Sequence, residues 1–244
     1  MRARNALTVS ALVAVLVTAA AIPGAQAAKK TKHYLHPKYE SFGVRKIGIL
    51  PWLERKQDLD AERIMRIELA QGLEPTGYSF TNAVVLRTMA RSVGAESLFV
   101  ACMDQFRDKG EIRAGTLQEL GSRISVDAVL VAFLDRWEQE VVPITVRGNS
   151  RTEIGARLVL YSARTGELLW SEYLEMRGEG PYNDPSTGEI GTTPLQGRAG
   201  PTTGLEPPSY EEIADKWSQR LTQEFPPPPK PREEAGPKSE DTDP

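Results

Sequence analysis

Apolar and polar residues between positions 44 and 225 recur with two periods, and their order predicts the strands and helices of one domain. Strand-like runs cover residues 44–52, 78–80, 126–137, 152–162 and 168–176. Helical periodicity covers residues 58–73, 82–92, 116–124 and 209–225, while residues 96–106 are either helical or loop-like. This order predicts an α/β (α+β) fold, with a single small mixed sheet, packed helices and a C-terminal amphipathic helix.

The strongest strand signals lie in the second half of the chain. The first half of segment 126–137 is apolar on both faces, which is typical of a strand at the centre of a sheet. Segment 152–162 alternates, with Ile154 and Leu158 on one face and Arg157 on the other. A short link, Arg164-Thr165-Gly166, separates it from segment 168–176. The link predicts a β-hairpin with Gly166 in the left-handed conformation.

Each predicted helix has a polar start and an apolar face. Asp58 or Asp60 caps the first helix, and Thr116 caps residues 116–124 with Glu119 as its capping-box partner. The predicted inner faces are Ala61, Ile64, Met65, Leu69 and Leu73; Val85, Leu86 and Met89; Leu117, Leu120 and Ile124; and Tyr210, Ile213, Ala214, Trp217, Leu221 and Phe225.

Residues 1–27 have the pattern of an export signal. Arg2 and Arg4 precede an apolar run, and Ala25-Gln26-Ala27 fits a cleavage site before Ala28. The alternative is an uncleaved membrane anchor, because the apolar run is near the lower limit for crossing a bilayer. Cleavage predicts a periplasmic or secreted protein without a stable membrane span. The only cysteine, Cys102, is far from this site, so it cannot carry an N-terminal lipid.

Three further segments lack the composition of a packed core. Residues 28–43 are basic and aromatic and are predicted to be an extended arm before the domain at 44–225. Residues 178–208 are rich in Gly, Pro and Thr and predict a long loop. Residues 226–244 hold seven of the 18 prolines and predict a disordered tail.

Charge and cysteine content exclude some functions. The net charge of −3 comes from mixed charges without a basic stripe, which argues against nucleic acid as a partner. A single cysteine allows no internal disulfide. Cys102 lies in the apolar stretch 97–103, which favours a small buried side chain over a reactive thiol.

No catalytic, cofactor-binding or metal-binding set emerges from the sequence. The two histidines, His33 and His36, are spaced for a metal only on a helix, and Pro37 disfavours one there. The candidate carboxylates are Asp127, Asp135, Glu138, Glu153 and Glu167, and Arg136, Arg147, Arg151 and Arg157 are their expected partners. Trp52, Trp137 and Trp170 fall in strands and are expected to pack, or else to face a partner.

Four motifs carry a resemblance to known proteins: Lys46-Ile-Gly-Ile-Leu-Pro-Trp52, Val126-Asp-Ala-Val-Leu-Val131, Ala156-Arg-Leu-Val-Leu-Tyr161 and Thr165-Gly-Glu-Leu-Leu-Trp-Ser171. In their order, the chain resembles bacterial periplasmic lipoproteins related to the curli-secretion channel subunit, the penicillin-binding-protein activator lipoproteins and the TolB amino-terminal domain. Many members of this group carry a lipidated cysteine, which this chain lacks.

The resemblance implies a non-catalytic module that binds another envelope protein during envelope assembly or transport. We expect binding at one end of the sheet or through the loop 178–208, where Tyr182, Leu195 and Leu205 are the candidate partner-binding residues. The alternatives are an idle linker at this loop, a periplasmic small-molecule or glycan-binding protein, and a carboxylate-based hydrolase.

Overall fold

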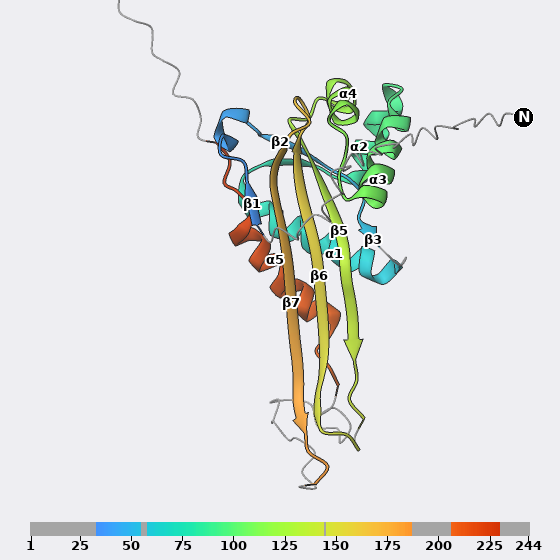
Figure 1. The fold of residues 1–244 in the computed structure, drawn as a ribbon, viewed down its shortest axis with the longest axis vertical. Helices are drawn as coiled ribbons and strands as arrows, with labels where there is room; N and C mark the ends of the chain where they lie inside the picture. Colours follow the sequence, from blue (N-terminus) through green and yellow to red (C-terminus); the bar gives the residue numbers. More distant parts are fainter. Residues whose placement is uncertain (1–32, 55–57, 144, 187–205, 230–244) are drawn as a thin grey trace, which may run out of the picture. The chain divides into compact units, whose positions relative to one another are not determined.

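A computed structural model describes residues 33–54, 58–143, 145–186 and 206–229, which include every element of one mixed sheet and its helices (Figure 1). The strands are β1 (His33–Leu35), β2 (Lys46–Ile49), β3 (Leu53–Glu54), β4 (Ser79–Thr81), β5 (Ala128–Glu140), β6 (Gly148–Ser162) and β7 (Leu168–Asn183). The helices are α1 (Leu59–Leu73), α2 (Ala83–Ser92), α3 (Glu96–Lys109), α4 (Ala114–Ile124) and α5 (Tyr210–Glu224), with 3-10 turns η1 (Tyr39–Phe42) and η2 (Glu74–Thr76). The predicted α/β class is confirmed.

The sheet combines an antiparallel half with a parallel half. Its strand order is β1-β7-β6-β5-β2-β4, and β3 pairs with β5 beyond the end of β2. Strands β1, β7, β6 and β5 are antiparallel neighbours, whereas β2, β3 and β4 run parallel to their partners. The predicted hairpin joins β6 to β7, and Gly166 has the left-handed φ of 72°.

Each face of the sheet has its own apolar core, as the alternation in β6 predicts. Ile154, Ala156 and Leu158 pack with α1 and α5 on one face, whereas Val159 and Tyr161 pack with α2, α3 and α4 on the other. Helices α1 and α5 approach closely at Gly72, where an added Cβ atom would lie 2.7 Å from the backbone oxygen of Ser218. A side chain at position 72 would therefore push the two helices apart.

Most predicted helix boundaries and inner faces are confirmed. Asp58 caps α1, Asn82 caps α2 and Ser209 caps α5, each by accepting hydrogen bonds from backbone N–H groups. The predicted cap at Thr116 is wrong, because α4 begins at Ala114 without a side-chain cap. The inward position of Val85 is also wrong: it is 47% exposed, and Ala90 lies inside instead.

The predicted N-terminal arm is partly folded onto the sheet. Residues His33–Leu35 pair with Trp170–Glu172 of β7 as an edge strand. Tyr39 in η1 is buried, and its hydroxyl lies 2.6 Å from the hydroxyl of Tyr78. β1 and η1 form through contacts with residues distant in the sequence, so the local periodicity of the arm does not predict them. The signal at 1–27 lies outside the described residues.

Two predicted irregular segments also begin later than the sequence predicts. Residues 178–183 belong to β7 and not to a loop, because they continue its pairing with β6. Pro226 is buried, and the backbone oxygens of Pro226 and Pro227 accept hydrogen bonds from Tyr78 Oη. The remainder of the predicted loop at 187–205 and of the predicted tail at 230–244 lies outside the described residues.

Strands β5, β6 and β7 extend well past α2, α3 and α4, which gather near the other end of the same strands (Figure 1). We call residues 135–140, 148–157 and 173–183 the outer ribbon. Its inner face meets residues 206–210, where Trp137 stacks on Tyr210 with ring centroids 4.1 Å apart. No helix within the described ranges is long and apolar enough to cross a membrane.

Candidate functional site

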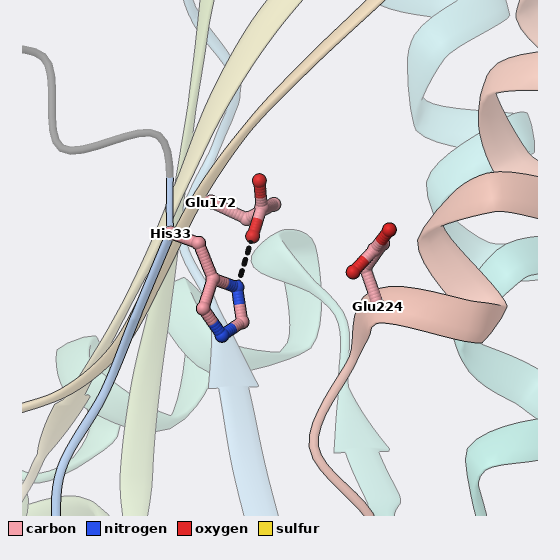
Figure 2. Close-up of side chains that lie close together, drawn as sticks. All are labelled: His33, Glu172 and Glu224. Carbon is pink, nitrogen blue, oxygen red and sulfur yellow. Dashed lines mark hydrogen bonds and ion pairs between the residues drawn. The ribbon is translucent and has the colours of Figure 1, made fainter.

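Three side chains that can each ligate a metal ion meet between β1, β7 and α5. They are His33, Glu172 and Glu224, and one ligand atom of each lies within 4.8 Å of the others (Figure 2). The ring atom Nδ1 of His33 lies 2.5 Å from Oε2 of Glu172. We call these residues the β1–β7–α5 cluster.

The fold brings this cluster together from distant parts of the chain. His33 and Glu172 are directly opposite each other in the antiparallel pair of β1 and β7. Glu172 alternates with Trp170 and Leu174 on the face of β7 that packs against α5, and Glu224 is the last residue of that helix. Figure 2 shows the Glu224 side chain reaching from the helix end toward the His33–Glu172 pair.

Burial distinguishes the members of the cluster. The Glu172 side chain is only 7% exposed, whereas the His33 side chain is 55% exposed. An ionised carboxylate with so little contact with water requires a partner, and His33 supplies one. Glu224 has Arg220 on its own helix at 3.9 Å. The cluster can therefore hold a hydrogen bond between His33 and Glu172, or a metal ion that takes nitrogen and oxygen ligands.

A second group of polar and charged side chains covers the outer ribbon on the face opposite α5. We call it the charged ribbon face. It consists of Arg136, Glu138, Glu140, Arg151, Glu153, Arg157, Tyr173, Glu175, Arg177 and Glu179, which follow from the register of the three strands. Most of these residues are half-buried or exposed.

Glu153 is at the centre of the charged ribbon face. Its side chain is 11% exposed, and three guanidinium groups surround it: Arg136 at 3.0 Å, Arg151 at 3.5 Å and Arg177 at 3.6 Å. The same arginines pair with the outer carboxylates of Glu175, Glu140 and Glu179. This network joins all three strands. Its three guanidinium groups offset the charge of Glu153, which is typical of a structural ion-pair network.

Among the other candidate carboxylates, Glu138 is directly opposite Glu153 on the charged ribbon face, whereas Asp127 and Glu167 lie away from it. Asp127 lies at the opposite end of β5 and accepts hydrogen bonds from the backbone of Arg45 and Lys46 and from the Arg164 guanidinium. Partial burial opposes its charge, but these hydrogen bonds outweigh burial and lower the pKa of Asp127. Asp135 lies near the Tyr173 hydroxyl, at 3.5 Å, and Glu167 accepts a hydrogen bond from Thr165 in the hairpin.

An open cavity of about 920 Å³ lies beside η1, at the same end of the sheet as Asp127. Its lining includes His36, Lys38, Phe42, Arg45 and Arg164, together with Pro226 and Pro227. His36 does not join His33, because its ring packs edge-on against Phe42 at 5.1 Å. The basic side chains make this cavity suited to an anionic molecule.

The predicted partner-binding residues have different outcomes. Tyr182 is 54% exposed near the end of β7, whereas Leu195 and Leu205 lie outside the described residues. Cys102 is buried as expected, and burial raises the pKa of its thiol to about 12. Trp52 and Trp170 are core residues, and Trp137 packs on Tyr210.

Sequence reasoning missed the β1–β7–α5 cluster. The one available signal was Glu172, an acid at an inward position of a strand that otherwise places Trp170 and Leu174 there. A buried acid of this kind requires a partner, but the sequence does not show that His33 is this partner.

Comparison with known proteins gives no family. No family model and no curated protein matches the sequence. Solved structures that the chain resembles include lipoprotein GNA1162 from Neisseria meningitidis, with 22% identity, a TM-score of 0.38, and coverage of 55% of this chain and 83% of that one. The PelC dodecamer from Paraburkholderia phytofirmans has 13% identity and a TM-score of 0.39, with coverage of 73% and 86%. The LpoB C-terminal domain from Salmonella enterica has 11% identity and a TM-score of 0.32, with coverage of 55% and 82%.

These identities are low and the TM-scores are below 0.5. The functional proposal therefore does not rest on these neighbours.

Proposed function

We propose that this protein is a non-catalytic periplasmic module that binds another envelope protein during envelope assembly or transport, with the outer ribbon as its binding surface. The observation that carries the proposal is the extension of β5, β6 and β7 beyond the helices that cover one face of the sheet (Figure 1). Core stability does not require strands of 13, 15 and 16 residues, since strands in globular proteins are usually about 3–10 residues long.

The edges of the outer ribbon are available for strand addition. Strand β1 covers β7 only at Trp170–Glu172, and β3 covers β5 only at Phe133 and Leu134. Among the strands that the structure describes, none pairs with the outer sides of β5 and β7 past these points. A strand edge without a neighbouring strand can accept an extended segment of a partner.

The charged ribbon face supplies specificity. Its arginines and glutamates pair across the strands, so the surface presents fixed charges of both signs and not a disordered set of side chains. A partner with the complementary charges binds in a defined orientation and associates faster. A partner with mismatched charges is repelled by like charges. Tyr182 adds an exposed aromatic group at the end of β7, within the segment 178–208 that the sequence predicts to be a loop.

Site-specific photo-crosslinking in the envelope of the native host tests the proposal. A photoreactive amino acid is placed at Tyr182 or Glu179 on the outer ribbon, and at Leu59 or Val84 on the helices, which are 82% and 69% exposed. We expect the ribbon positions to form one discrete product with an envelope protein, which mass spectrometry identifies, and the helix positions to form none.

The helix positions control for random collision, since they are as accessible as the ribbon positions. Equal crosslinking at all four positions, or products at the helix positions alone, would contradict the outer ribbon as the binding surface. Replacement of residues 187–204 by a short Gly-Ser link leaves β7 intact and separates the ribbon from the loop, because only a loop-dependent partner is lost in that variant.

The cavity beside η1 supports a second candidate function, the binding of an anionic small molecule. Lys38, Arg45 and Arg164 contribute positive charge there, and Glu40 also lines the cavity. Arg164 already pairs with Asp127 at 2.8 Å, which reduces the charge available to a ligand. Thermal-shift screening with anionic metabolites and glycans, compared between the wild type and Lys38→Ala, distinguishes this function from protein binding.

A further inference from the structure

Within the part of the chain that the structure describes, the β1–β7–α5 cluster holds two carboxylates and one imidazole. Glu172 and Glu224 contribute two carboxylates, and the imidazole of His33 contributes at most one positive charge (Figure 2). The Arg220 guanidinium lies 3.9 Å from the Glu224 carboxylate. The side chains of both residues are well exposed. Such an exposed pair contributes little, so a divalent cation would balance the two carboxylates better than a proton on His33.

The chemistry of the three side chains selects the kind of cation. One imidazole nitrogen and two carboxylate oxygens are a ligand set that zinc and similar transition metals accept, with bonds of about 2.0–2.2 Å. Calcium and magnesium prefer oxygen ligands alone, and in larger number. The nitrogen of His33 therefore favours a transition metal.

The geometry requires only a small adjustment. Ligand atoms around one tetrahedral zinc ion lie roughly 3.4 Å apart, as follows from bonds of about 2.1 Å. Nδ1 of His33 and Oε2 of Glu172 are hydrogen-bonded at 2.5 Å and must separate to this distance, whereas the ligand atom of Glu224, within 4.8 Å of both, must approach. Rotation of the Glu224 side chain, which is 40% exposed at the helix end, closes the remaining gap.

We propose that His33, Glu172 and Glu224 form a binding site for one divalent transition-metal ion such as zinc. The ion replaces the hydrogen bond between His33 and Glu172, because metal ligands must be deprotonated. His33 is 55% exposed, which gives the ion access from solvent, while buried Glu172 fixes its position. The three protein ligands leave a fourth position for water.

The proposed site has a structural consequence. His33 belongs to the first described strand, and Glu224 ends the last helix, so a bound ion joins β1 and α5 through β7. A ligand that binds only the folded chain stabilises it by mass action. Zinc is therefore expected to raise the melting temperature of the protein and to protect the edge strand β1 from amide hydrogen exchange. The sequence pattern predicts no metal site, so the proposed site departs from that prediction.

The test is calorimetric titration of the full exported chain, without an affinity tag, with zinc sulfate after treatment with a chelator. We expect one zinc ion per chain, and a dissociation constant weakened at least about tenfold in Glu224→Gln and in His33→Gln. Two variants serve as matched controls: His36→Gln changes the other histidine, and Glu211→Gln changes an exposed glutamate of the same helix. Both are expected to bind zinc as the wild type does.

Glu224→Gln keeps the test valid if His33→Gln disturbs the edge strand, because Glu224 is partly exposed and is not hydrogen-bonded to β1. Its melting temperature in chelator shows whether it is folded. The proposal is overturned if the wild type takes up less than one equivalent of zinc in the micromolar range. It is also overturned if Glu224→Gln is folded and binds zinc as tightly as the wild type.

Discussion

The indole of Trp217 donates a hydrogen bond from Nε1 to the backbone oxygen of Leu174, 3.3 Å away. Trp217 lies in the middle of α5 and Leu174 in the middle of β7, and both side chains are fully buried. The Trp217 ring also lies 6.0 Å from that of Trp52, which follows β2. This contact holds the last helix against the sheet and so keeps β7 in place where the outer ribbon begins.

Replacement of Trp217 by alanine should therefore destabilise the whole domain. Loss of a fully buried tryptophan leaves a large cavity, and the expected cost is about 3–5 kcal/mol. Urea denaturation followed by circular dichroism measures it. Tyr182→Ala is the control, because this aromatic side chain is 54% exposed and should leave the denaturation midpoint in place. An unchanged midpoint for Trp217→Ala would show that α5 is not docked.

Glu153→Gln should lower the free energy of unfolding by less than Trp217→Ala does. The substitution removes the charge that Arg136, Arg151 and Arg177 surround, but each arginine retains an outer carboxylate partner. We expect a loss of about 1–2 kcal/mol that shrinks in high salt, since the arginines are half exposed. Glu140→Gln, at an exposed position of the same network, should cost less than about 0.5 kcal/mol. Equal losses in the two variants would argue against the central role of Glu153.

Cys102 should be unreactive in the folded protein. Its side chain is fully buried, and burial raises the pKa of the thiol to about 12, so almost no thiolate forms at neutral pH. A thiol reagent should label the protein in urea and leave it unlabelled in buffer over the same time at pH 8. Rapid labelling of the native protein would contradict the packing of α3 against the sheet.

Truncation should divide the C-terminal segment into a packed and a dispensable part. Removal of residues 230–244 should leave the denaturation midpoint unchanged, because the composition of this tail cannot support a core. Removal of residues 226–244 should lower the free energy of unfolding by about 1 kcal/mol more. Tyr78 Oη then loses its hydrogen-bond acceptors, the backbone oxygens of Pro226 and Pro227. Identical midpoints for both truncations would mean that these contacts are not formed in solution.

The fold could be predicted where burial imposes a period on the sequence. Ile154, Ala156 and Leu158 alternate because β6 has a helix-covered core on each side, and Trp217 and Leu221 recur because α5 buries one face. The cap at Asp58 could be predicted because side-chain oxygens at helix starts accept backbone hydrogen bonds. In each case the signal is local.

The candidate site depends on contacts that leave no local signal. A strand of three residues such as His33–Leu35 has no usable period, and it forms because β7 offers an edge far along the chain. Residues 178–183 read as a loop because of their Gly and Pro, but pairing with β6 makes them strand. Arg136 and Arg151 were predicted as partners of the candidate carboxylates and Arg177 was not, since only the register of β5, β6 and β7 shows that all three converge on Glu153.

The affinity of the purified, crosslinked partner for variants of the outer ribbon tests the central claim most directly. Biolayer interferometry compares the wild type with the double variant Tyr182→Ala, Glu179→Ala and with the control Leu59→Ala, after unchanged melting temperatures have shown that all are folded. We expect the double variant to bind at least about tenfold more weakly, a loss of about 1.4 kcal/mol, and Leu59→Ala to bind like the wild type. Wild-type affinity in the double variant, or a comparable loss in Leu59→Ala, would contradict the assignment of the outer ribbon as the surface that binds an envelope protein.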